Sequence, residues 1–172
     1  SMATPHVAGA AALLVQRNGE WGHDEIKAAL VGTATRGSVT SWVDGAGRPW
    51  ETGAGRLRVD RLLDVRLLSQ PPVIDGLEAV AGQVLTHTLQ LQRVEEDIES
   101  VTVRWVPSGD LEGMVLEPED GSTVNFNSNG QAEVIVTVTV PVGTPLGDYT
   151  GWLDLQDDGD VVTTVPYHVR VR

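Results

Sequence analysis

The stretch from Ser1 to Gln16 places small and apolar side chains with the period of an α-helix. Hydrophobic positions recur every three or four residues, at Ala3, Val7, Ala10, Ala11 and Leu14, which predicts a helix from about Ser1 to Gln16. Pro5 is compatible with this helix because it falls in the first turn, where its missing N–H has no intrahelical partner. The opposite face is also small or apolar, so the pattern predicts a helix that is buried on all sides.

Further helical signals follow before residue 70. A second helix is predicted from Asp24 to Val31, because acidic residues stand at its start and Gly32 at its end. The segment from Gly37 to Gly55 is rich in Gly, Ser, Thr and Trp, which predicts a loop that can contain a short hairpin. The segment from Val59 to Leu68 is predicted to form a last short helix with Asp60 as its N-cap.

The hydrophobic period changes to two beyond Gln70-Pro71-Pro72. In Ala132–Val140, valines at every second position alternate with Ile135 and two threonines, as expected of a strand with one buried face. Turn residues separate seven segments of this kind, which are Val84–Gln92, Val101–Val106, Met114–Glu117, Ser122–Phe126, Ala132–Val140, Tyr149–Leu155 and Val161–Val171. About seven short strands in about one hundred residues predict a β-sandwich of the immunoglobulin or fibronectin type. We therefore divide the chain into residues 1–70 and residues 71–172.

Composition narrows the classes of function. The chain has no cysteine, which excludes disulfide scaffolds, thiol catalysis and cysteine-based zinc sites. The net charge is −12, to which residues 1–70 contribute +1 and residues 71–172 contribute −13. This charge argues against nucleic acid or an anionic membrane as a partner, since both need clustered positive charge. No apolar run is long enough to span a membrane.

The most specific motif stands at the start of the chain, and it is Ser1-Met2-Ala3-Thr4-Pro5-His6-Val7-Ala8-Gly9. It resembles the segment around the active serine of the subtilisin-like serine proteases (subtilases), in which the serine follows Gly-Thr and opens a long buried helix. The resemblance covers about residues 1–68 and continues through Trp21, Ile26–Leu30, Thr33-Ala34 and Gly53–Val59. The sequence departs from the family at Gly22, where a Ser or Thr cap is usual, and at Arg58, where a small polar residue is frequent.

The resemblance implies acyl transfer with Ser1 as the catalytic nucleophile. Ser1 would attack a peptide carbonyl, a histidine would take its proton, and an aspartate would orient the histidine. In the family, the aspartate, the histidine and the side-chain amide of the oxyanion hole all lie upstream of the serine. His6 is five residues from Ser1 and points about 140° away around the helix, so it is not predicted to be the base. We therefore expect this chain to have no protease activity by itself.

Residues 71–172 resemble the fibronectin-type-III-like or immunoglobulin-like domains that follow the catalytic domain in many large subtilases. The resemblance lies in Val134–Val140, Val142–Gly151 and Val165–Tyr167. The fold class implied for the whole chain is an α/β remnant, made of the C-terminal helices of a subtilisin-like parallel-sheet domain, plus an all-β sandwich. The implied roles of the sandwich are to pack against the protease domain, to space it from a surface, or to help select substrates.

One acidic cluster is a candidate for a metal site. Asp154, Asp157, Asp158 and Asp160 lie close together, but their spacing does not match the helix–loop–helix calcium pattern. We interpret the cluster as a solvated hairpin turn and keep calcium as a hypothesis; no other metal or cofactor is expected. Trp105 and Trp152 fall within predicted strands, so we expect both in the sandwich core.

Three interpretations of function remain open. The favoured one is the C-terminal part of a secreted or cell-surface subtilisin-like endopeptidase, whose partners would be a protein or peptide substrate and the upstream part of the same peptidase domain. The second is a non-catalytic interaction or spacer module whose sandwich binds a partner. The third is an N-terminal-nucleophile hydrolase with the amine of Ser1 as base, although that chemistry normally starts a strand rather than a helix. A leading Ser-Met pair is also left when an expression tag is removed, in which case Ser1 is not the nucleophile.

Overall fold

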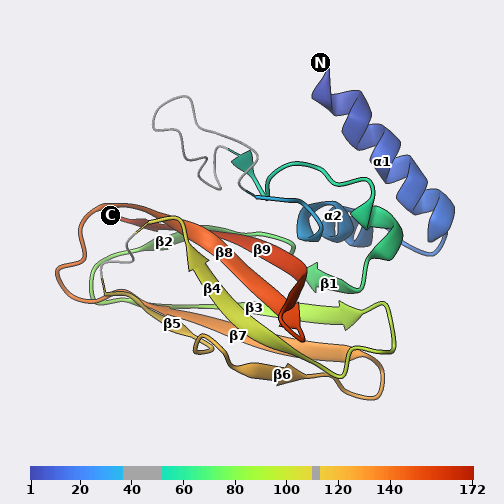
Figure 1. The fold of residues 1–172 in the computed structure, drawn as a ribbon. Helices are drawn as coiled ribbons and strands as arrows, with labels where there is room; N and C mark the ends of the chain where they lie inside the picture. Colours follow the sequence, from blue (N-terminus) through green and yellow to red (C-terminus); the bar gives the residue numbers. More distant parts are fainter. Residues whose placement is uncertain (37–51, 110–112) are drawn as a thin grey trace.

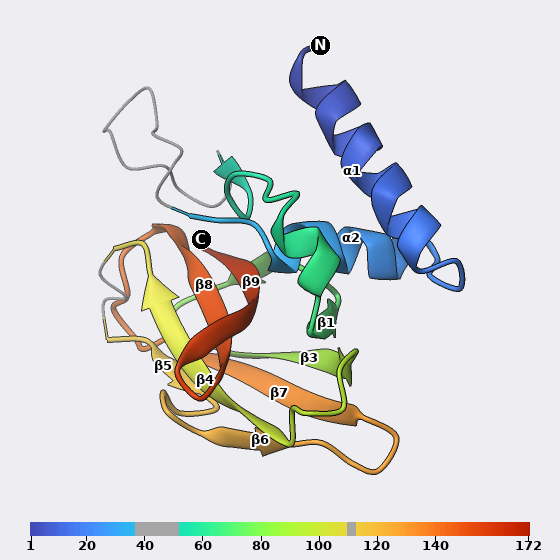
Figure 2. The same ribbon diagram turned by 45° about the vertical axis from the view of Figure 1, so that its right-hand side comes forward.

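The polypeptide passes through two helices before it enters a pair of β-sheets (Figure 1). The computed structural model describes residues 1–36, 52–109 and 113–172. Helix α1 (Ala3–Arg17) points away from the sheets, whereas α2 (His23–Gly32) lies beside β1 (Leu67–Gln70) and β9 (Asp160–Val171), as Figure 2 shows. The predicted loop from Gly37 to Gly55 lies outside the described residues except for residues 52–55.

Both helices predicted before residue 32 form, and local hydrogen bonds define their ends. Helix α1 begins at Ala3 and ends where the N–H of Asn18 donates to the carbonyl of Leu14 at 2.8 Å. Helix α2 begins after Gly22, whose N–H donates to the carboxylate of Glu25 at 2.9 Å. This bond is one half of a capping box, and it needs no side chain at the cap position. Glycine is therefore sufficient to start α2.

The helix predicted from Val59 to Leu68 is wrong. Only Arg61–Asp64 forms a helical turn, the 3-10 helix η1, and the chain then extends into β1. Leu67 packs into the core between the two sheets, and Leu68 packs into a cluster with the helices. Consecutive residues reach opposite sides only in an extended chain. Burial of both leucines therefore overrides the local helix signal.

The strands of the described residues form two sheets. The four-stranded sheet has the order β1-β3-β7-β5 and is antiparallel throughout. The five-stranded sheet has the order β2-β9-β8-β4-β6, in which β2 pairs with β9 in parallel and the other pairs are antiparallel. The remaining strands are β2 (Ile74–Ala79), β3 (Val84–Arg93), β4 (Ser100–Pro107), β5 (Val115–Glu117), β6 (Thr123–Asn125), β7 (Gln131–Thr139) and β8 (Gly147–Asp157). All seven predicted strands are confirmed to within two residues, and β1 and β2 are additional.

The main core lies between the two sheets. In β7, Val134, Val136 and Val138 are buried and Ile135 is 54% exposed, so the predicted alternation is confirmed. A second cluster of buried side chains joins the helices to the outer side of β1, and it consists of Ala10, Leu14, Ile26, Ala28, Ala29, Leu62, Val65 and Leu68. The fold is thus a small helical segment that rests on an all-β sandwich, as the fold class predicts.

The hairpin between β8 and β9 closes with a two-residue turn. Asp157 pairs with Asp160, and Asp158 and Gly159 between them have positive φ values of 48° and 89°. Two consecutive residues with positive φ are typical of the type I′ hairpin turn, which Asp-Gly favours. Asp158 and Asp160 are exposed, so the predicted solvated hairpin turn is confirmed for these two residues.

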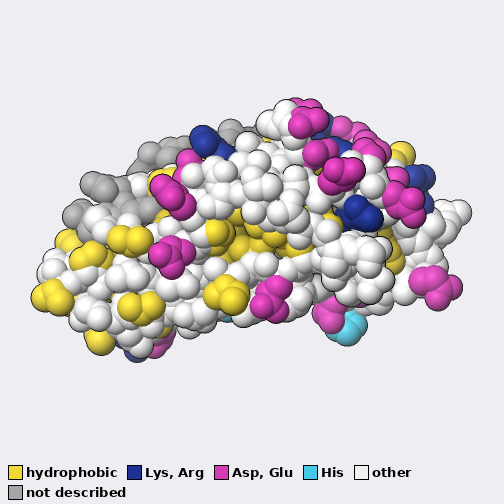
Figure 3. Space-filling view, turned by 90° about the horizontal axis from the view of Figure 1, so that it is seen from below, with side chains coloured by type: hydrophobic (Ala, Val, Ile, Leu, Met, Phe, Trp, Pro, Cys, Tyr) yellow, Lys and Arg dark blue, Asp and Glu magenta, His cyan; other side chains and the backbone are white. Residues whose placement is uncertain are grey.

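One end of the sandwich exposes apolar side chains. Val80, Val142 and Leu146 are exposed, with Val142 at 89%, and they belong to the connections that follow β2 and β7. A Cβ on Gly82 would lie 3.3 Å from the side chain of Val142, which places these two connections side by side. Figure 3 shows hydrophobic side chains gathered at the left end of the molecule.

Candidate functional site

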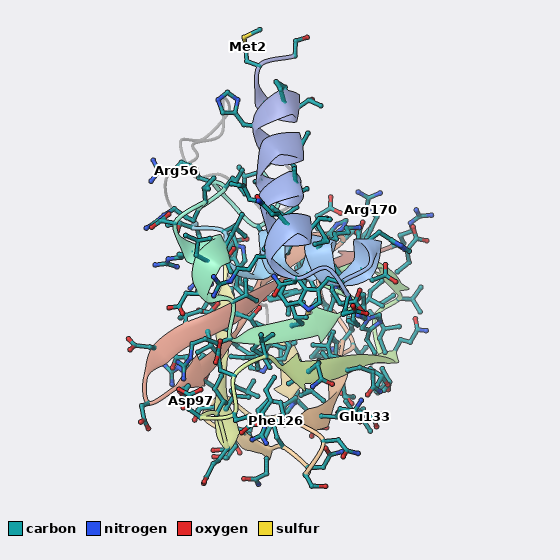
Figure 4. All side chains as sticks on the ribbon, turned by 90° about the vertical axis from the view of Figure 1, so that its right-hand side faces the viewer. Met2, Arg56, Asp97, Phe126, Glu133 and Arg170 are labelled. Atoms are coloured by element: carbon teal, nitrogen blue, oxygen red, sulfur yellow. The ribbon has the colours of Figure 1, made fainter. Side chains whose placement is uncertain are left out.

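Ser1 lies at the solvent-exposed end of α1. It precedes Met2, the N-cap residue, and all of the first nine residues are exposed. Figure 4 shows Met2 at the tip of α1, far from Asp97, Phe126 and Glu133 of the sandwich. The first N–H groups of a helix have no intrahelical acceptor. Ser1 therefore stands beside free backbone donors, at the positive end of the helix dipole.

His6 is the histidine nearest to Ser1 in the sequence, and its ring is bound to its own helix. The Nδ1 atom of His6 lies 2.7 Å from the carbonyl oxygen of Met2. A carbonyl oxygen can only accept a hydrogen bond, so Nδ1 carries the hydrogen and donates it. The described hydrogen bond of His6 is thus to the backbone of α1 and not to the hydroxyl of Ser1.

The other three histidines lie on separate elements. His23, at the start of α2, contacts the carboxylate of Asp24 at 3.0 Å. His87 lies within β3, and His168 in β9 contacts the carboxylate of Asp148 at 2.8 Å. Helix α1 has fifteen residues and is about 22 Å long, and α2 follows at the end opposite to Ser1. The two histidine–aspartate pairs are therefore not positioned to activate Ser1.

Helix α1 carries apolar side chains that no described element covers. Met2 is 78% exposed, and Val7, Leu13 and Val15 are between 44% and 51% exposed. No atom lies within 4 Å of the position that a Cβ on Gly9 would take. The sequence predicts that this helix is buried on all sides in a complete parallel-sheet domain. In the structure it is buried only where it meets α2 and η1.

Within the described residues, neither helix has the length and hydropathy needed to cross a bilayer.

The glycine-flanked segment from Gly53 to Val59 pairs with the chain that follows α2. Thr35 and Arg56 form an isolated antiparallel bridge with two hydrogen bonds of 2.9 Å. Arg58 donates to the hydroxyl of Thr35 at 3.2 Å and to the carboxylate of Asp60 at 2.8 Å. The hydrogen bond from Arg58 lowers the pKa of Asp60 to about 2.

Arg36 binds Asp154 of the sandwich through both carboxylate oxygens. Its Nη1 donates to Oδ1 at 2.5 Å, its Nη2 donates to Oδ2, and the hydroxyl of Thr164 donates to Oδ1 at 2.8 Å. The guanidinium carbon lies 5.4 Å from the centre of the Trp152 ring. Asp154 is only 2% exposed, so the prediction that it belongs to a solvated turn is wrong. Trp152 is buried on the outer face of β8 and not in the core between the sheets.

The structure separates the acidic cluster into side chains with different surroundings. Asp154 is buried, Asp157 binds Arg66 at 2.6 Å, and Asp158 and Asp160 are exposed. In residues 1–36, 52–109 and 113–172, no three or more His, Cys, Asp or Glu side chains are arranged to hold a metal ion. Calcium therefore remains a hypothesis that rests on the sequence alone.

The ion pair of Arg36 and Asp154 is the part of the arrangement that sequence reasoning missed. A signal for it exists in the sequence, because Asp154 stands between Leu153 and Leu155 near the end of a predicted strand. A carboxylate in a buried strand requires a cation or several hydrogen-bond donors. The sequence does not identify the partner, which is 118 residues away.

Several solved structures resemble part of the chain. A family 123 glycoside hydrolase from Clostridium perfringens is 17% identical, with 55% of this chain and 22% of that chain covered and a TM-score of 0.42. The SrpA adhesin from Streptococcus sanguinis is 18% identical, with 62% of this chain and 57% of that chain covered and a TM-score of 0.44. At these TM-scores the similarities carry no functional argument.

The sequence comparisons concern the N-terminal segment and the chain as a whole. The family model of the subtilase family matches residues 1–56. The minor extracellular protease Vpr of Bacillus subtilis (strain 168) is 26% identical over 176 residues, which cover all of this chain. This chain spans 21% of the length of Vpr, or about a fifth. The first 56 residues of this chain are therefore similar to the subtilase family.

Proposed function

We propose that this chain is the C-terminal part of a subtilisin-like serine endopeptidase, with Ser1 as the nucleophile. The observation that carries the proposal is the Ser-Met-Ala-Thr-Pro-His motif of residues 1–6, which lies at the N-terminus of α1 inside the segment that matches the subtilase family. The similarity to Vpr, an extracellular protease by name, supports a parent protein that is a protease and is secreted or attached to the cell surface.

The proposed reaction is hydrolysis of a peptide bond through an acyl-enzyme. The hydroxyl oxygen of Ser1 attacks the carbonyl carbon while a histidine takes the hydroxyl proton, and the same proton then goes to the departing amine. A water molecule hydrolyses the ester in the second half of the reaction. The free N–H groups and the dipole at the start of α1 favour the negative charge that develops on the carbonyl oxygen.

The base and its aspartate are proposed to come from the upstream part of the same peptidase domain. Serine is a weak nucleophile without an adjacent base. His6 donates its Nδ1 hydrogen to Met2, and the other histidines lie on α2, β3 and β9. The same upstream part would cover the exposed apolar side chains of α1. The isolated chain is therefore expected to be inactive.

Labelling with a fluorophosphonate tests the proposal, because this reagent reacts with activated serines. We expect the parent peptidase to take up one label, on the peptide that contains Ser1. The Ser1→Ala variant should lose both the label and the hydrolysis of casein, whereas Ser128→Ala, in an exposed turn of the sandwich, should keep both. The isolated chain should neither react nor hydrolyse casein. A label on another serine, or casein hydrolysis by Ser1→Ala, would contradict the proposal.

The alternative is a non-catalytic interaction or spacer module. One observation favours it: the described residues 80–83 and 140–147 at the end of the sandwich carry no charge and expose apolar side chains, in a chain with a net charge of −12. Exposed apolar patches are typical of contact surfaces. The labelling experiment separates the two functions, because a parent protein that is only an interaction module does not react at Ser1.

A further inference from the structure

Side chains on the outer face of β8 and β9 together bind one guanidinium group, that of Arg36. We propose that this face is a permanent docking surface for the segment that matches the subtilase family, of which residues 1–36 and 52–56 are described (the subtilase segment). The sandwich is then a fixed support of the peptidase domain and not a freely tethered module. The inference rests on the proposed function only for the identity of the domain to which the segment belongs. The contacts that carry it are independent of catalysis.

The first observation is the burial of a carboxylate. Asp154 and Thr164 are directly paired across β8 and β9, and the hydroxyl of Thr164 donates to Asp154. The side chain of Asp154 is 2% exposed, whereas that of Arg36 is 29% exposed. A buried carboxylate is costly unless its oxygens are paired. The guanidinium group of Arg36 is bidentate and donates a hydrogen bond to each of the two carboxylate oxygens. The single ammonium of a lysine cannot form this parallel pair of hydrogen bonds.

The second observation is the aromatic side chain beside this carboxylate. Trp152 lies two residues before Asp154 on β8, so the two side chains share one face of the sheet. Its ring lies 5.4 Å from the guanidinium carbon of Arg36, within the range of a cation–π interaction. One strand thus presents a carboxylate and an aromatic ring to the same cation.

The third observation is the close packing of α2 on β9. Gly32 is the last residue of α2, and a Cβ at this position would lie 2.1 Å from the hydroxyl oxygen of Thr163. Thr163 is itself 1% exposed. The end of α2 therefore touches the strand that neighbours β8, immediately before the chain reaches Arg36.

The fourth observation is the way in which the two parts are joined through β1. Leu67 lies in the sandwich core and Leu68 in the helical cluster. Arg66, the residue before this strand, binds Asp157 of β8 at 2.6 Å. Domain boundaries usually fall in exposed linkers that few contacts cross. Here the connection is itself a strand of the sandwich, which holds the subtilase segment in one orientation.

A double-mutant cycle on the 172-residue chain tests the docking surface. Removal of one partner of a buried ion pair is strongly destabilising, so Asp154→Asn and Arg36→Gln should each lower the melting temperature by about 10 °C. The double variant should be no less stable than the worse single variant, because neither charge is then left alone. Glu78→Gln is the matched control, since Glu78 forms a half-exposed ion pair with Arg172 on the same sheet. It should change the melting temperature by about 2 °C or less.

Backbone relaxation by NMR gives a second readout that needs no variant. Amides of α2 and of β8 should report the same rotational correlation time. In Asp154→Asn, hydrogen exchange should increase in α2 and stay unchanged in β3 and β7.

Independent tumbling of α2, strictly additive effects in the cycle, or an unchanged melting temperature in both single variants would each overturn the proposal. If Asp154→Asn does not fold, Thr164→Val retains the ion pair and should show a smaller loss. None of these measurements depends on catalysis. A negative result of the labelling experiment would therefore contradict the proposed function but not the proposed docking surface.

Discussion

Gly55 lies so close to Thr35 that a Cβ atom on Gly55 would be 2.4 Å from the carbonyl oxygen of Thr35. The φ angle of Gly55 is +122°, a conformation that residues with a side chain rarely adopt. The bridge between Thr35 and Arg56 depends on this approach, because its hydrogen bonds involve the residue next to Gly55. Space and backbone conformation therefore both require glycine at this position.

Replacement of Gly55 by alanine should disrupt this bridge. We expect Gly55→Ala to lower the free energy of unfolding by about 3 kcal/mol, because strain and a backbone clash add. Gly53→Ala is the control, since Gly53 also has a positive φ, +59°, but no atom lies within 4 Å of its Cβ position. It should lose about 1 kcal/mol. Urea denaturation measures both values, and equal losses would show that the contact with Thr35 is unimportant.

Gly9 distinguishes the exposed helix of this chain from the packed helix of the proposed parent. In this chain a Cβ at Gly9 meets no atom within 4 Å, so Gly9→Ala should stabilise α1 by up to about 1 kcal/mol and increase its helical circular dichroism. In the parent peptidase, where small residues would allow close packing, the same variant should lower the melting temperature. A higher melting temperature in the parent would mean that α1 is not tightly packed there. Ala12→Gly, at another exposed position of α1, should reduce helicity in the isolated chain.

Leu13 and Leu14 are adjacent, but they are 46% and 1% exposed. We expect Leu14→Ala to lower the free energy of unfolding by about 3 kcal/mol, because it leaves a cavity in the helical cluster. Leu13→Ala should change it by less than about 0.5 kcal/mol and should reduce self-association through the exposed side of α1. Urea denaturation and sedimentation velocity measure the two effects. Similar losses of stability in the two variants would show that α1 does not pack in this orientation.

The hydrogen bonds of Asp148 make the stability of the sandwich depend on pH. Asp148 accepts hydrogen bonds from Arg170 at 2.7 Å and from His168 at 2.8 Å, and these lower the pKa of Asp148 below its usual value. A depressed pKa in the folded state stabilises the fold fully above the pKa of the unfolded carboxyl, about 4, and this contribution is lost as the pH falls through the folded-state pKa.

The expected result is a pH-dependent difference between two proteins. Wild type should require more urea for unfolding than Asp148→Asn above about pH 4, and the difference should shrink below that pH. Urea midpoints between pH 2 and pH 7 measure it. The exposed turn variant Asp158→Asn should follow wild type at every pH. A difference that grows toward low pH would contradict the role assigned to Asp148.

The sequence predicts those parts of the fold whose signal is local. Alternation in β7 and the Asp158-Gly159 turn are visible in a few consecutive residues. In β2 the register shifts between Ile74 and Leu77, which breaks the alternation and hides the strand. Strand β1 has only four residues, and its identity as a strand comes from packing on both sides rather than from its own sequence.

The same distinction applies to the candidate site. The motif at Ser1 is continuous, so it can be recognised in the sequence. The carboxylate of Asp154 is conspicuous in a hydrophobic strand, but the sequence does not show which cation neutralises it. Only the folded chain brings Arg36 to it. Non-local contacts of this kind are the part of the structure that the sequence pattern does not reveal.

The long separation between Arg36 and Asp154 also sets an order of events during synthesis. The ribosome adds about 5 to 20 residues per second, so Arg36 is made roughly 6 to 24 s before its partner 118 residues later. The β8–β9 hairpin, with its two-residue turn, is a local structure of the kind that forms within about 1 to 10 μs. The wait for translation, and not the formation of the hairpin, is therefore the slow step. Until β9 has left the ribosome, the surface formed by β8 and β9, to which Arg36 binds, is incomplete.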